Sequence, residues 1–68
     1  MVDVNKLRGK MAEKGYSQQF VAEKIGVTPK TFYSRMKKGV FDSDEITTLV
    51  DLLDIENPTE IFFAKPVT

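Results

Sequence analysis

A cluster of positive charge lies between residues 28 and 39, in a chain of 68 residues whose formal net charge is zero. The stretch reads TPKTFYSRMKKG and contains four cations, two aromatic residues and no acidic residue. Lysine and arginine bind nucleic-acid phosphates, and lysine can also donate to the O6 and N7 atoms of guanine. The stretch is therefore a candidate surface for a polyanion, and its cations are Lys30, Arg35, Lys37 and Lys38.

The positive and negative charges of the whole chain are also separated along the sequence. Residues 1–41 contain nine cations and three acids, which gives +6, whereas residues 42–68 contain one cation and seven acids, which gives −6. Such asymmetry can present a basic face to a polyanion while the acidic part sets the overall charge. The alternative is that both groups are solvated helix faces without a ligand, and charge alone does not separate the two.

Other kinds of chemistry have few residues to support them. The chain has no histidine and no cysteine, which removes the commonest general base and the thiolate metal ligands. Asp42-Ser43-Asp44-Glu45 resembles the start of a calcium loop, but Thr47 and Leu53 occupy the positions where that loop needs glycine and glutamate. We therefore expect no enzyme activity, no catalytic residues, no metal site and no cofactor.

The sequence does not indicate a membrane partner. The longest apolar run, Ile61 to Ala64, is far shorter than the roughly 20 residues that a membrane-spanning helix needs. The N-terminal stretch MVDVNKLRGK lacks the apolar core of a signal peptide. We expect a soluble, intracellular domain.

Helix-capping residues and helix-ending glycines divide the chain into five predicted helices. The cationic stretch forms one of them. Glycines suit the ends of the first three helices, and Ser17, Thr28 and Asp42 suit the starts of the second, third and fourth. Asp42 and Glu45 form a capping-box pattern, and Asn57-Pro58 suggests a cap and first residue for a last helix. The pattern predicts an all-α fold, with helix two at about 18–25 and helix three at about 29–38.

Helix three has two faces when its residues are projected at 100° per residue. Phe32 and Met36 are four residues apart and are expected to pack in the core. The opposite face can enter a major groove about 12 Å wide, where Lys30 is the best candidate for a base contact. The other candidate base contacts are Tyr33, Ser34 and, at the edge of the face, Thr31.

Phosphate contacts require cations or free N–H groups rather than base-reading geometry. The start of helix two offers a partial positive charge and unpaired donors, so Ser17 and Gln18 are candidates. Thr28, Lys37 and Lys38, near the two ends of helix three, complete the set. There are alternatives without a ligand: Ser17 and Thr28 can serve as caps, and the two lysines favour the helix dipole by about 0.3–1 kcal/mol.

The segment SQQFVAEKIGVTPKTFYSRMKKG resembles the helix-turn-helix of the phage Cro and repressor family. The similar features are Gln18 early in helix two, Ala22 in its middle, Gly26-Val27 at the turn and apolar residues inside helix three. NKLRGKMAEKGYS and FDSDEITTLVDLLDI resemble the first and fourth helices of the family, so the resemblance covers most of the chain. It implies a compact five-helix domain like that of lambda repressor over residues 1–68, a phosphate contact from Gln18, and double-stranded operator DNA in a bacterial host as the partner.

The sequence departs from that family at the start of helix three, where several relatives place Gln, Arg or Asn for base contacts. Pro29 occupies one such position, so we expect modest base discrimination. Phe20 falls on the outer side of helix two, near the expected place of Tyr33, and exposed aromatics favour a protein partner. A second hypothesis is therefore a regulator that binds a repressor protein, and a phage integration or excision accessory factor is an alternative within DNA binding.

A specific DNA-binding form needs two copies whose helices reach half-sites about 34 Å apart. We place the dimer surface at Ile61, Phe62 and Phe63, because a short helix cannot bury three consecutive large apolar residues on one face. At most two can face the core, which leaves Phe62 or Phe63 for a second copy. The alternative is that the remaining ring folds over the core edge beside helix four.

Overall fold

Five α-helices joined by short connections make up the protein in a computed structural model that describes residues 2–63. Their bounds are Val4–Lys14 for α1, Gln18–Ile25 for α2, Pro29–Lys38 for α3, Ser43–Leu53 for α4 and Pro58–Phe62 for α5. Residues 2–63 contain no strand, so the all-α prediction of five helices is confirmed. The last helix ends at Phe62, so Phe63 lies just outside it.

Each of the first four helices begins at a side chain that accepts a hydrogen bond from its first turn. Ser17, Thr28 and Asp42 cap α2, α3 and α4 as predicted, and Asp3, which the pattern did not identify, caps α1. The prediction that Asn57 caps α5 is wrong, because its side chain makes no capping hydrogen bond and its backbone lies at φ −128° and ψ 80°. So short a helix depends on the packing of its apolar residues rather than on a cap.

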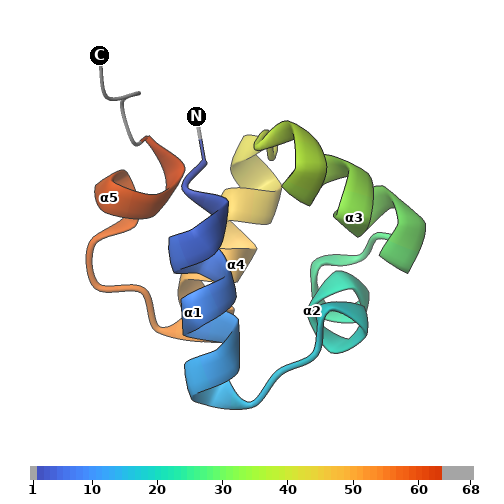
Figure 1. Ribbon diagram of the computed structural model, residues 1–68, viewed down its shortest axis with the longest axis horizontal. Helices are drawn as coiled ribbons and strands as arrows, with labels where there is room; N and C mark the ends of the chain where they lie inside the picture. Colours follow the sequence, from blue (N-terminus) through green and yellow to red (C-terminus); the bar gives the residue numbers. More distant parts are fainter. Residues whose placement is uncertain (1, 64–68) are drawn as a thin grey trace.

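The turn between α2 and α3 depends on Gly26. Its φ of 83° lies in the left-handed region that glycine adopts without a steric penalty. The helix ends there, the Val27 N–H donates to the Ala22 carbonyl at 3.0 Å, and Thr28 begins α3 directly afterwards. The result is a helix-turn-helix arrangement, which Figure 1 shows on the side of the molecule away from α5.

The core lies between α1, α4 and the helix-turn-helix. Its fully buried side chains come from all of these elements, because each helix carries apolar residues at helical spacing. α1 packs against both α4 and α5. The largest fully buried side chains are Leu7, Val21, Phe32, Leu49 and Leu53.

The segment before α1 ties two distant parts of the chain together. The Val2 N–H donates to the Gly39 carbonyl at 3.0 Å, and the Asp3 N–H donates to the Ile61 carbonyl at 2.6 Å. The C-terminal end of α3 and the helix α5 are thereby held to the same short segment. These bonds help to position α3.

Candidate nucleic-acid interface

Two buried side chains fix the orientation of α3. Phe32 is 0% exposed and Met36 is 3% exposed, and the Phe32 ring lies 5.8 Å from the ring of Phe41 between centroids. A helix anchored along one stripe cannot rotate about its axis without exposing these side chains. The opposite face is left to solvent, and its exposed side chains are Lys30, Tyr33, Ser34, Lys37 and Lys38.

The cations of α3 fall into two groups. Arg35 Nε lies 2.9 Å from Oε2 of the buried Glu45, which places the arginine in an ion pair. Its Nε–H is not directed at the carboxylate, since this atom has no hydrogen-bond partner in the part of the chain that the structure describes. The remaining cations, Lys30, Lys37 and Lys38, have no carboxylate within 4.0 Å among residues 2–63.

The ion pair belongs to a junction between α3 and α4. Glu45 Oε1 accepts from the Asp42 N–H at 2.9 Å, while Asp42 Oδ1 accepts from the Glu45 N–H at 2.8 Å. This capping box, predicted from the sequence, also turns the second Glu45 oxygen toward Arg35. Arg35 is therefore paired with a carboxylate. The three lysines are the cations of α3 that have no carboxylate partner among residues 2–63.

The two helix starts differ in the hydroxyl protons they leave free. Ser17 Oγ accepts from the Phe20 N–H at 3.1 Å, and its own proton remains available. Thr28 Oγ1 accepts from the Thr31 N–H at 3.2 Å and donates to Thr31 Oγ1 at 3.0 Å, so its only proton is used. In this arrangement the Thr31 hydroxyl proton is available to a phosphate or base, and the phosphate contact of Thr28 stays a prediction.

A shallow hollow runs beside α3. It is lined by Thr31, Ser34, Arg35 and Lys38, which lie on one helical stripe, and by Val40 just beyond the helix. The sequence pattern predicted Thr31, Ser34 and Lys38 as DNA contacts and identified Arg35 only as a cation of this stretch. Val40 was not identified, because an apolar residue after a helix-ending glycine commonly packs back on its own helix. Its side chain is 60% exposed.

The aromatic neighbour of Phe20 differs from the one predicted. Phe20 is 36% exposed, and its ring centroid lies 4.7 Å from that of Tyr16. Lys24 Nζ lies 5.3 Å from the Phe20 centroid. Phe20 was expected near Tyr33, but among residues 2–63 the ring pairs are Tyr16 with Phe20 and Phe32 with Phe41. Tyr16 lies before the N-cap Ser17, so helical spacing could not have predicted this pair.

At the end of α5 the structure decides which of the three apolar residues is free. Ile61 is 3% exposed and Phe62 is 2% exposed, whereas Phe63 is 61% exposed. Phe63 borders an open apolar hollow that also includes Val40 and Phe62. The predicted dimer surface is thereby reduced to Phe63, with Val40 as a neighbour that the sequence pattern did not name.

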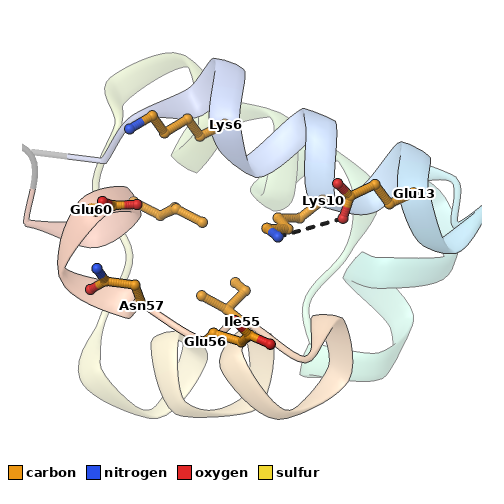
Figure 2. A pocket seen from close by; sticks show the side chains of 8 residues that line it. Lys6, Lys10, Glu13, Ile55, Glu56, Asn57 and Glu60 are labelled. Carbon is orange, nitrogen blue, oxygen red and sulfur yellow. Dashed lines mark ion pairs between the residues drawn. The ribbon is translucent and has the colours of Figure 1, made fainter.

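A third hollow lies between α1 and the segment around α5. Figure 2 shows Lys6 and Lys10 on its α1 side and Glu60 with Asn57 across from them. Lys10 Nζ is 3.5 Å from a Glu13 carboxylate oxygen, so part of its charge is already matched. Among residues 2–63, no group of three carboxylates lies close enough to hold a metal ion. No helix in this range is long and apolar enough to cross a membrane.

Comparisons of the chain with protein-family models, with curated proteins and with solved structures found no match. The function is therefore inferred from the geometry and charge of α3 and its surroundings.

Proposed function

We propose that the protein is a small transcriptional regulator of the Cro and repressor type, which binds double-stranded operator DNA by inserting α3 into the major groove. One observation carries this proposal: α3 presents three lysines without carboxylate partners among residues 2–63, and its own sequence contains no acid. A polyanion is the ligand that complements such a face. The protein needs no cofactor or metal for this role and works in the cytoplasm of a bacterial host.

The dimensions of α3 suit a major groove. An α-helix with its side chains is about 10–12 Å in diameter, which matches a groove about 12 Å wide, and the ten residues of α3 extend about 15 Å. Lys30, in the first turn, is the candidate base contact, while Lys37 and Lys38, in the last turn, reach toward the phosphates at the edge of the groove. The buried Phe32 and Met36 supply the rigid support that such a contact needs.

The start of α2 supplies the second contact with the backbone. The first N–H groups of a helix have no intrahelical acceptor, and they carry a partial positive charge. At α2 these groups lie beside the Ser17 hydroxyl and the half-buried Gln18. We propose that they clamp one phosphate while α3 lies in the groove. This contact fixes the register of the domain but carries no sequence information.

We further propose that two copies bind one operator. A single helix-turn-helix touches few base pairs, and a second copy doubles the contact over half-sites about 34 Å apart. The exposed Phe63 and Val40 lie around one apolar hollow, which suits contact with the same patch of a second copy. Such a contact would remove from water the two most exposed large apolar side chains among residues 2–63.

A salt-titrated gel shift on the DNA flanking the protein's own gene tests the DNA proposal. The expected result is specific binding whose affinity falls steeply with salt, in contrast to weaker binding of random DNA. Lys37→Ala or Lys38→Ala should weaken both classes of binding and reduce the salt slope by about one unit. Lys6→Ala removes the same charge from α1 and serves as the control. Binding that neither salt nor the α3 substitutions alter contradicts the proposal.

The aromatic pair at the start of α2 supports a second candidate function. The Phe20 ring is partly exposed and packs on the half-buried Tyr16 with Lys24 above it, and exposed aromatics are typical anchors for a protein partner. In this alternative the protein binds a repressor and modulates its DNA binding. Phe20→Ala should then abolish a pull-down of the repressor encoded beside it and leave DNA affinity unchanged. Tight operator binding together with no captured repressor rejects this alternative.

A further inference from the structure

The exposed face of α3 has a restricted set of chemical groups. It carries the ammonium groups of three lysines, the hydroxyls of Thr31 and Ser34, and the phenol ring of Tyr33. The only guanidinium of the helix, on Arg35, is paired with Glu45. The helix contains no carboxylate and no carboxamide. The face therefore offers donors, hydroxyls and one ring, but no group that makes a bidentate amide contact.

This set favours some base edges over others in a major groove. Adenine is best recognised by a bidentate amide of Asn or Gln, and the cytosine amino group needs an acceptor such as Glu or Asp. Guanine presents two acceptors, O6 and N7, which suit a lysine. Thymine presents a C5-methyl group, which suits an apolar surface. Hydroxyls can donate or accept, so Ser34 and Thr31 discriminate little.

Tyr33 is the apolar group that the face offers to such a methyl. Its side chain is 55% exposed, and it belongs to neither of the two ring pairs within residues 2–63. Lys30 and Lys37 lie three residues before it and four residues after it, on the same stripe of the helix. A ring placed between two cations is held close to the DNA by the phosphates and bases that those cations attract.

We infer that α3 reads a guanine and a thymine close together in each half-site, with Lys30 on guanine O6 and N7 and the Tyr33 ring on the thymine methyl. The two residues are separated by about 4.5 Å along the helix, and successive base pairs are about 3.4 Å apart. The guanine and the thymine therefore fall on adjacent base pairs or about two apart. This inference rests on the proposed function, because it requires α3 to lie in the major groove.

Selection of duplexes from a randomised pool provides the site for the test. The wild-type protein should enrich sequences in which G and T recur at this spacing. Replacing that thymine with deoxyuracil removes only the methyl group and should weaken binding about fourfold. Replacing the guanine with 7-deazaguanine removes N7 and should weaken binding at least about fivefold. Inosine is the matched control, since it lacks only the amino group in the minor groove.

The protein variants assign each loss to a side chain. Tyr33→Ala should bind thymine and deoxyuracil duplexes equally, whereas Tyr33→Phe should keep the fourfold difference, because the ring makes the contact. Lys30→Ala should lose the difference between guanine and 7-deazaguanine, while Lys6→Ala keeps it.

The outcomes separate this inference from the proposed function. Tight, salt-dependent binding to selected sites that lack the G and T pair overturns the inference and leaves the DNA-binding proposal intact. The same holds if Tyr33→Ala still distinguishes thymine from deoxyuracil. Failure to retain any DNA at low salt overturns both.

Discussion

Gly9 lies in the exposed middle of α1, where a Cβ atom would meet no other atom within 4 Å. Glycine in a helix interior costs stability relative to alanine, because the unfolded chain has more backbone freedom to lose. We expect Gly9→Ala to raise the free energy of unfolding by about 0.5–1 kcal/mol. Urea denaturation monitored by circular dichroism measures this change.

A second glycine provides the control at the same scale. Gly26 adopts a φ of 83°, and a side chain in this conformation is strained even where space is free. Gly26→Ala should therefore lower the free energy of unfolding by about 1–2 kcal/mol. If Gly9→Ala and Gly26→Ala change the free energy of unfolding equally, the backbone conformation of the glycine does not determine the change in stability.

At the scale of elements, the junction of α3 with α4 depends on Glu45. This side chain is 6% exposed and uses one oxygen for the capping box and the other for Arg35. Glu45→Ala should lower the free energy of unfolding by about 1–3 kcal/mol, because a cap is lost and the Arg35 ion pair is broken. Glu45→Gln keeps an acceptor for the Asp42 N–H and should cost less. The measurement is urea denaturation at pH 7.

The exposed Asp44 lies beside Glu45 in the same helical turn and serves as the control for that junction. Its side chain contributes mainly through the helix dipole, which is worth about 0.3–1 kcal/mol. If Asp44→Ala destabilises the protein as much as Glu45→Ala, the buried position of Glu45 contributes nothing to the junction.

An ion pair at the surface connects the end of α1 with the end of α4, between Lys14 and Asp54. The Asp54 carboxylate raises the pKa of the Lys14 ammonium above its ordinary value of 10.5, first by a side-chain hydrogen bond and then by Coulomb attraction. Because the pKa is higher in the folded state, the pair stabilises the fold below about pH 10.5, and this contribution is lost as the pH rises through the raised pKa.

Asp54→Asn removes this pair and retains a residue type that tolerates the left-handed φ of 51°. At pH 7 and low salt we expect the variant to be slightly less stable than the wild type, and the difference should vanish above the raised pKa of Lys14. Parallel denaturation curves at several pH values test this. Asp51→Asn, at an exposed acid without an ion pair among residues 2–63, should show no such trend.

At the scale of the whole molecule, two adjacent phenylalanines have opposite environments. Phe62 is 2% exposed and Phe63 is 61% exposed. Phe62→Ser should lower the free energy of unfolding by about 3–5 kcal/mol, as expected for a large side chain removed from a core. Phe63→Ser should leave stability within about 0.5 kcal/mol and shift the protein from dimer to monomer. Thermal denaturation and sedimentation equilibrium measure the two effects.

The association measurement decides whether the exposed apolar patch is a dimer surface. Val40→Ser changes the other exposed side chain of the same hollow and should weaken association without unfolding the monomer. A wild-type protein that stays monomeric at the highest concentration, with and without DNA, would contradict the dimer proposal and favour the protein-binding alternative.

The local features of this protein follow from short-range signals in its sequence. The caps at Ser17, Thr28 and Asp42 were predictable because each depends on atoms two or three residues away. The division of α3 into a core face with Phe32 and Met36 and an exposed face was predictable for the same reason, since helical periodicity places side chains on faces. The candidate base contacts follow from that periodicity.

The tertiary structure decided the features that join distant residues. The local capping box orients Glu45, but only the tertiary fold brings Arg35, ten residues earlier, next to it, and that pair determines which cations of α3 remain without a carboxylate partner among residues 2–63. Periodicity also could not separate Phe62 from Phe63, because which ring is buried depends on how α5 packs against the rest of the domain. The physical reason is that caps and helix faces depend on neighbours within one or two turns, whereas burial and ion pairing depend on how whole helices pack.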